Sequence, residues 1–161
     1  GPGATTSATG TAQPAGGAEG PRELAPQPAA NDLEALVQQT RDAGVAVSLV
    51  KVGQARTLPA GMGLTLYRIC QEALTNVMKH AGPATSVTVL VRWGEQEVVL
   101  EVTDDGRGAS ATGDGAGQGL LGMRERAAMF GGSVSAGPRP GGGFRVKATL
   151  PTPRAVRPVA S

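Results

Sequence analysis

The apolar positions of this chain follow two periods, and together they predict the secondary structure of a single domain. Between Asn31 and Gly44, apolar residues recur every three or four positions, which predicts an amphipathic helix with Asn31 as its N-cap and Gly44 as its stop. The same period from Pro59 to Ala81 predicts a longer helix, and a short one is expected over residues 120–130. Alternating, valine-rich runs predict strands over residues 45–52, 86–92, 97–103, 133–137 and 144–150.

The predicted order of elements is helix, strand, helix, two strands, loop, helix, two strands. Each of the two strand pairs is joined by a short, turn-rich connection, which predicts hairpins and therefore a mixed, largely antiparallel sheet. Helices that cover one face of such a sheet form an α+β two-layer sandwich, not a doubly wound fold.

The two ends of the chain differ from its middle. Residues 1–30 contain many Gly and Pro residues and one large aliphatic residue, Leu24, so we expect a disordered tail or linker there. The opening Gly1-Pro2-Gly3 is typical of what removal of an expression tag leaves behind. The structured domain is expected over residues 31–151, followed by a C-terminal tail over residues 152–161.

The composition excludes several classes of function. One Trp, one Tyr and two Phe leave little to stack on bases, and the formal net charge is only +2, so a dedicated nucleic-acid binder is not expected. The single cysteine, Cys70, and the single histidine, His80, exclude an intrachain disulfide and disfavour a His/Cys zinc site. Because neither a long apolar run nor a signal peptide is visible, we expect a cytoplasmic domain without membrane contact of its own.

Four polar residues follow one stripe of the long predicted helix. Glu72, Asn76, Lys79 and His80 recur at i, i+4, i+7 and i+8, along the border of the apolar face. They place a carboxylate, a carboxamide, an ammonium and an imidazole side by side. Taken singly, each has an ordinary alternative: Lys79 and His80 complement the helix dipole, and Glu72 and Asn76 face water.

Two glycine-rich segments lie downstream. In Asp104-Asp105-Gly106-Arg107-Gly108, a carboxylate at a strand end suits an exocyclic amino group such as adenine N6, and the glycines allow close approach of a flat ring; a simple turn is the alternative. Residues 117–123, Gly-Gln-Gly-Leu-Leu-Gly-Met, lead into the short predicted helix, whose free N–H groups suit phosphate. A lid without a ligand is the alternative there, and we expect residues 110–117 to be disordered without nucleotide.

In this order, the three segments resemble the ATP-binding domain shared by gyrase, the Hsp90 chaperone, sensor histidine kinases and MutL. The nearest likeness is to the catalytic domain of sensor histidine kinases that phosphorylate NarL-type response regulators, and it covers about residues 31–151. Residues 67–81, 119–126 and 141–144 carry this narrower match.

The resemblance implies ATP and Mg²⁺ as cofactors. Residues 72–80 match the N box, residues 104–108 the G1 box and residues 117–123 the G2 box of that family. Asn76 would then coordinate Mg²⁺, Asp104 would read adenine N6, and Glu72 would be the catalytic residue that positions Mg²⁺ or polarises a nucleophile. The implied nucleotide-binding residues are Asn76, Lys79, His80, Asp104, Gly106, Gly108, Gly117, Gly119, Leu120, Gly122 and Met123.

The chain departs from the family pattern in two places. Many relatives carry Thr after the last glycine run, where this chain has Phe144. The family's threonine contact to the adenine region must then be absent or come from elsewhere, and Thr149 is a candidate for it. No helix with an acceptor histidine precedes Asn31, and His80 lies within the expected nucleotide site. We therefore expect a monomeric catalytic fragment that phosphorylates a histidine on a separate dimerisation and phosphoacceptor domain, for relay to a NarL-type response regulator.

Two further functions remain open from the sequence. A stand-alone anti-sigma-type serine kinase shares the nucleotide fold and needs no acceptor helix. A non-catalytic module in which ATP gates an interaction would also use these motifs.

Overall fold

The computed structural model describes residues 32–82, 85–106 and 114–153, which form three helices and five strands. These are α1 (Leu33–Asp42), β1 (Ala46–Val52), α2 (Met62–His80), β2 (Ser86–Trp93), β3 (Glu97–Asp104), α3 (Asp114–Ala128), β4 (Ser133–Pro138) and β5 (Phe144–Pro151). None of these helices is both long enough and apolar enough to span a membrane.

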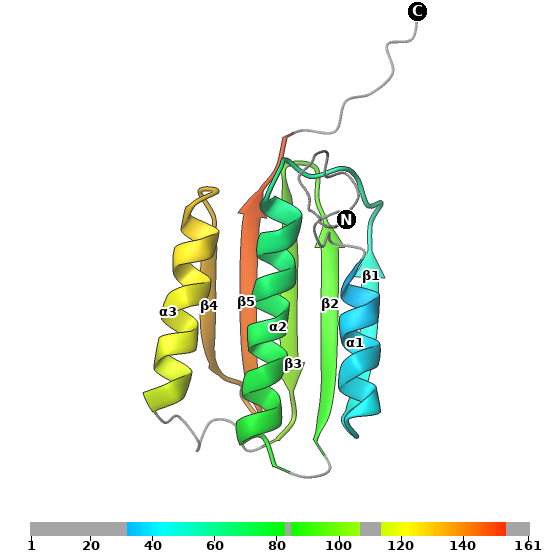
Figure 1. Cartoon of the computed structure of the whole chain (residues 1–161), viewed down its shortest axis with the longest axis vertical. Helices are drawn as coiled ribbons and strands as arrows, with labels where there is room; N and C mark the ends of the chain where they lie inside the picture. Colours follow the sequence, from blue (N-terminus) through cyan, green and yellow to red (C-terminus); the bar gives the residue numbers. More distant parts are fainter. Residues whose placement is uncertain (1–31, 83–84, 107–113, 154–161) are drawn as a thin grey trace, which may run out of the picture.

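The strands form one mixed sheet in the order β1-β2-β3-β5-β4. β1 and β2 run parallel and are connected through α2, whereas the other three pairs are antiparallel. All three helices lie on one face of the sheet, with α2 between α1 and α3 (Figure 1). The predicted two-layer α+β sandwich is therefore confirmed.

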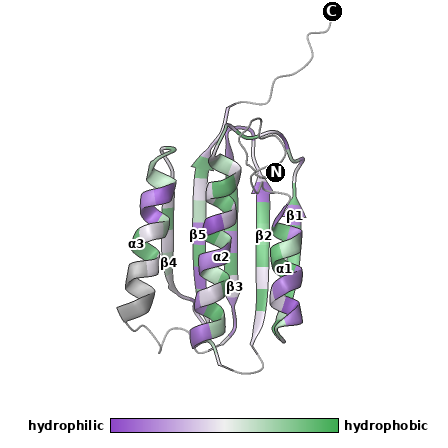
Figure 2. Ribbon diagram, in the orientation of Figure 1, coloured by the Kyte–Doolittle hydropathy of each residue, from purple (hydrophilic) through white to green (hydrophobic). Residues whose placement is uncertain are grey.

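The core lies between the helices and the sheet. Figure 2 shows hydrophobic residues along β2 and a mixture of hydrophobic and hydrophilic residues on each helix, as expected for helices with one buried face. Leu66 and Ile69 of α2 are fully buried against Val89, Leu100 and Ala148 of the sheet layer. Burial of these side chains is the main favourable contribution to folding.

α1 begins later in the structure than the sequence predicts. The helix begins at Leu33 with Asp32 at the N-cap position, and Asp32 makes no side-chain capping hydrogen bond. The predicted N-cap, Asn31, lies outside the described residues. Thr152 was expected in the C-terminal tail. In the structure it is buried and donates its N–H to the Gln96 carbonyl at 2.9 Å, so it belongs to the structured domain.

The start of α3 corrects the prediction more strongly. The helix begins at Asp114, not near Leu120, so the glycine-rich residues 115–119 have helical backbone. Glycine costs about 1 kcal/mol per residue in a helix, which disfavours a helix without forbidding it. Met123 and Ala127 are fully buried and anchor the rest of α3 to the core, so the helix can propagate towards its N-terminus from there.

Cys70 gives a first testable prediction. The side chain is fully buried on α2, and this burial raises the pKa of the thiol to about 12. At pH 8 only about one thiol in 10⁴ would be ionised, and the thiolate is the reactive form. We expect iodoacetamide to label the folded protein at least about 100-fold more slowly than the urea-unfolded protein, by mass spectrometry. Equal rates would contradict the buried position.

Candidate functional site

The segments singled out in the sequence meet around α2. The end of α2, the end of β3, the start of β5 and the start of α3 all lie at the same end of the molecule (Figure 1). Two close contacts connect these segments to α2. One joins Gly106 to the C-terminal end of the helix, and the other joins Gly119 of α3 to Glu72 in its middle.

Gly106 allows the end of β3 to approach the end of α2. A Cβ atom at this position would lie 2.4 Å from the Ala81 carbonyl oxygen and 2.7 Å from Thr85 Oγ1, distances that no side chain tolerates. Thr85 is buried, and its hydroxyl donates to the Ala81 carbonyl at 2.9 Å. The glycine is therefore required by space, and it brings Asp104 beside the last turn of α2.

Asp104 is a buried carboxylate, 4% exposed. Its Oδ1 accepts a hydrogen bond from the Gly106 N–H at 2.8 Å, so the predicted turn is present. In the described part of the chain no group hydrogen-bonds Oδ2, which leaves this oxygen for a ligand. Burial, reinforced by the charge of Asp105, raises the pKa of Asp104, against the opposing effects of the Gly106 N–H and Arg139.

The backbone on either side of Asp104 is held from two directions. Asp105 donates its N–H to the Ser86 carbonyl at 3.2 Å, and its Oδ1 accepts from the Ser86 N–H at 2.8 Å. On the other side, Gly143 lies against the Asp104 carbonyl: a Cβ there would be 1.9 Å from that oxygen. The Asp104 side chain is therefore fixed in direction before any ligand binds.

The polar stripe of α2 continues the site. Glu72 and Asn76 are half-buried and Lys79 is exposed. His80 is half-buried, and its Nε2 atom is buried without a hydrogen-bond partner among the described residues. Burying an unpaired polar atom costs about 1–3 kcal/mol, so such an atom points to a ligand as its partner. The unpaired imidazole nitrogen and the available Asp104 oxygen both fit a polar ligand such as a nucleotide.

Glu72 contacts α3. Its Oε2 atom lies 2.7 Å from where a Cβ of Gly119 would be, so the carboxylate occupies the space left by that glycine. Glu72 therefore lies between α2 and α3, on the flank where the predicted phosphate-binding segment runs.

The structure changes the role expected of residues 117–123. Because α3 begins at Asp114, the unpaired N–H groups of its first turn belong to residues 114–117. Gly119, Leu120, Gly122 and Met123 lie deeper in the helix. Met123 is fully buried, so its side chain anchors α3 to the core, whereas Leu120 is half-buried and only partly packed against the core.

Thr149 and Gly108 are the two remaining predicted residues. Thr149 lies on β5 between Ala148 and Leu150, both fully buried in the core, so its side chain points to the sheet face without helices. It is therefore on the wrong face to replace the threonine of the family pattern. Gly108 lies outside the described residues.

Gly143 was missed as a site residue. The run Gly141-Gly142-Gly143 was part of the family resemblance and of a turn between two strands, but no ligand role was assigned to it, and the contact of its last residue with Asp104 depends on strand pairing. The signal available in the sequence was the three adjacent glycines. Glycine adopts positive φ angles readily, and all three have positive φ angles in the structure.

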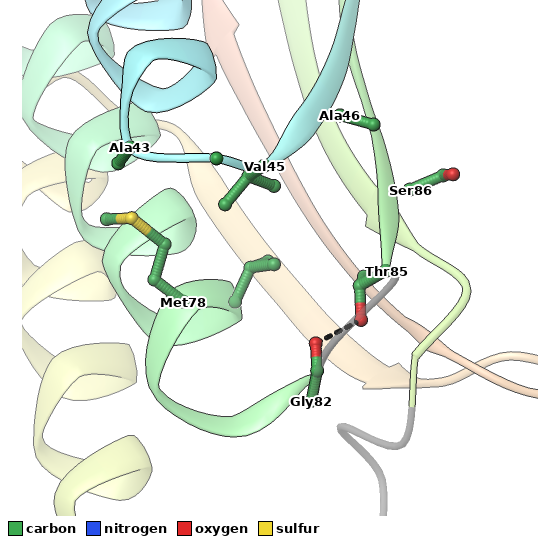
Figure 3. A pocket seen from close by; sticks show the side chains of 9 residues that line it. Ala43, Val45, Ala46, Met78, Gly82, Thr85 and Ser86 are labelled. Atoms are coloured by element: carbon green, nitrogen blue, oxygen red, sulfur yellow. Dashed lines mark hydrogen bonds between the residues drawn. The ribbon is translucent and has the colours of Figure 1, made fainter.

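A cavity of about 310 Å³ lies on the other flank of α2 (Figure 3). It is lined by residues of the α1–β1 turn, such as Ala43 and Val45, by Met78 of α2, and by Thr85 and Ser86 at the start of β2. None of the predicted site residues that the structure describes lines it. The cavity nevertheless adjoins the β3 end of the polar site, because Thr85 lies against Gly106 and Ser86 is hydrogen-bonded to Asp105.

Comparison with known proteins agrees with this arrangement. Residues 61–154 match the family of histidine kinase-, DNA gyrase B- and HSP90-like ATPases. The sensor histidine kinase YxjM of Bacillus subtilis is 33% identical over 121 residues, which cover 74% of this chain and 29% of YxjM. The chain therefore spans less than a third of the length of this relative.

Solved structures show the same fold. The catalytic domain of the histidine kinase ThkA matches with a TM-score of 0.60 at 13% identity, over 76% of this chain and 93% of that domain. Full-length ShkA, solved in complex with AMPPNP, also gives 0.60, at 23% identity over 80% of this chain and 30% of ShkA. The family match and the shared fold confirm the resemblance to the ATP-binding catalytic domain of histidine kinases. They do not favour the serine kinase or the non-catalytic module.

Proposed function

Because the chain belongs to the family of histidine kinase-, DNA gyrase B- and HSP90-like ATPases, we propose that it binds ATP with Mg²⁺ beside α2 as the catalytic domain of a sensor histidine kinase. The observation that carries this proposal is the buried Asp104 carboxylate, which has an available oxygen; the unpaired His80 nitrogen on α2 is a second polar atom without a partner among the described residues. Bound ATP supplies the γ-phosphoryl group. The acceptor is a histidine on a separate dimerisation domain, and a response regulator of NarL type receives the phosphoryl group next.

Each residue of the site has a role that its position supports. Asp104 Oδ2 accepts a hydrogen bond from the amino group of adenine, and the fixed backbone of the β3 end keeps it in place. The Asn76 carboxamide offers one oxygen to Mg²⁺, an ion that accepts few protein ligands and keeps water and phosphate oxygens. Lys79 and His80 bind the phosphates, and their contribution is charge neutralisation and hydrogen bonding.

The remaining contacts come from α3 and Glu72. The free N–H groups of residues 114–117 and the positive end of the helix dipole favour the triphosphate. Glu72, between α2 and α3, is placed to orient the groups around the transferred phosphoryl. Since ATP is available in the cytoplasm, this function places the domain there.

Replacement of Asn76 by Ala tests the metal assignment. We expect ATP affinity in the presence of Mg²⁺ to fall about tenfold, because the loss of one oxygen ligand costs about 1.4 kcal/mol. In EDTA, wild type and variant should bind equally. Isothermal titration calorimetry with both buffers measures the two affinities separately.

Gln71→Ala is the matched control, because Gln71 is another half-buried carboxamide on α2. It should bind ATP like the wild type in either buffer. If Asn76→Ala weakens binding equally with and without Mg²⁺, Asn76 does not bind the metal. If wild-type protein binds no ATP at all, the proposed function itself is wrong.

A further inference from the structure

Phe144 lies next to Asp104 although the chain separates them by 40 residues. Phe144 begins β5, Asp104 ends β3, and the two residues are paired across the antiparallel strands. Directly paired residues point to the same face of the sheet, with Cβ atoms about 4.5–5.5 Å apart. The ring of Phe144 is therefore on the face that carries the helices, beside the carboxylate.

The Phe144 ring is only half-buried. One part packs against the hydrophobic core, and the rest is accessible at the end of the sheet where α2 ends and α3 begins. Phe130 is half-buried too, so partial exposure alone does not distinguish Phe144; its pairing with the buried Asp104 carboxylate does. Exposed apolar surface next to a polar group of fixed direction is typical of a ligand-binding site.

The backbone holds Phe144 in place from its N-terminal side. The preceding residue, Gly143, is buried against the Asp104 carbonyl, and its own carbonyl accepts a hydrogen bond from the Arg139 N–H at 3.0 Å. Strand pairing holds it from the C-terminal side, where Arg145 is paired with Thr103. The ring and the carboxylate therefore form a rigid pair.

We propose that Phe144 is a further ligand-contacting residue of this site, whose ring forms an apolar wall of the base subsite beside Asp104. The pair suits a planar ring that carries an exocyclic amino group: the apolar ring of Phe144 contacts the planar base while the carboxylate accepts the amino N–H. A phenyl ring offers no hydrogen bond to phosphate and no oxygen ligand to Mg²⁺. The inference rests on the proposed binding of ATP, and it assigns base recognition to Phe144 as well as to Asp104.

Two substitutions and one matched control test this assignment by calorimetry. Phe144→Leu keeps an apolar side chain and removes the ring, and Phe144→Gln makes the wall polar. Because contact between a base and an aromatic ring is worth about tenfold in affinity, we expect Phe144→Leu to weaken ATP and ADP binding about tenfold, and Phe144→Gln at least as much. Binding of Mg²⁺-tripolyphosphate, which has no base, should not change. Phe130→Leu, at a half-buried phenylalanine at the opposite end of α3, should leave both ligands unaffected.

A direct measurement avoids dependence on how the variants fold. The chain has only two phenylalanines, so a Phe-labelled sample gives two sets of ring signals, and Phe130→Leu assigns them. In the ATP-saturated wild type, the Phe144 ring should show nuclear Overhauser effects to adenine H2 or H8. Absence of these effects would overturn the proposal, as would equal losses of ATP and tripolyphosphate affinity in the Phe144 variants.

The outcomes also separate this inference from the proposed function. If the wild type binds ATP and Asp104→Ala abolishes binding while both Phe144 variants bind normally, the nucleotide site stands and only the role of Phe144 is wrong. If the wild type binds no ATP, both are wrong.

Discussion

Replacement of Asp104 by Asn is expected to weaken ATP binding about 100-fold without destabilising the fold. The Gly106 N–H donates to Oδ1, so the carbonyl oxygen of an Asn side chain must take that position to keep the bond. Its NH₂ group would then replace Oδ2 and face the amino group of adenine. Both groups are hydrogen-bond donors, so no hydrogen bond can form between them. A lost hydrogen bond to a charged acceptor costs about 1.5–3 kcal/mol, which is roughly 10–150-fold in affinity.

The stability of this variant follows from the raised pKa of Asp104. Because the folded-state pKa lies above that of the unfolded chain, the carboxyl group contributes stability that is fully present below the unfolded pKa, about 3.9, and is lost as the pH rises through the folded pKa. At neutral pH the desolvated carboxylate therefore makes the fold less stable. Asn does not titrate, so the melting temperature of the variant at pH 7 should equal or exceed that of the wild type, and calorimetry between pH 4 and 8 measures the difference.

Asp105→Asn is the control for this prediction. Asp105 is exposed, and an Asn there can still accept the hydrogen bond from the Ser86 N–H. ATP affinity should stay within about threefold of the wild type, because the lost charge is solvent-exposed. Equal losses in the two variants would mean that general charge around the site, and not the Asp104 oxygen, controls binding.

Much of the fold could be predicted from periodicity because each element has one buried face. The alternation along β5 also specifies the direction of Thr149: Val146, Ala148 and Leu150 are core residues, so Thr149 faces the other side of the sheet. The start of α3 could not be predicted, since local propensity disfavours helix in a glycine-rich segment, and contacts with α2 and the core decide the outcome.

Candidate site residues could be proposed from the sequence, but their geometry could not. The spacing of Glu72, Asn76 and His80 predicts a common face of one helix, and local motifs mark Asp104 and Gly106. The pairing of Phe144 with Asp104 depends on the register of two strands that are distant in sequence, which no short pattern specifies. The contact of Gly143 with Asp104 has the same origin.

Gly143→Ala is expected to damage stability and binding together. Gly143 has a φ of +93°, which already costs a residue with a side chain about 1–2 kcal/mol. The added Cβ would also lie 1.9 Å from the Asp104 carbonyl oxygen, and backbone atoms cannot move aside as a flexible side chain does. With overpacking included, we expect a loss of about 3 kcal/mol in the free energy of unfolding by urea titration.

Gly141→Ala distinguishes the effect of the steric overlap with Asp104 from the effect of the positive φ angle. Gly141 has a φ of +86°, and no atom lies within 4 Å of its would-be Cβ, so it carries a similar angular strain without the clash. We expect a cost of about 1 kcal/mol and unchanged ATP affinity. Where Gly143→Ala is still folded, at low temperature, displacement of the Asp104 backbone should weaken ATP binding at least tenfold in calorimetric titrations. Equal effects of the two substitutions would show that Gly143 serves only the turn, and that Asp104 keeps its direction without it.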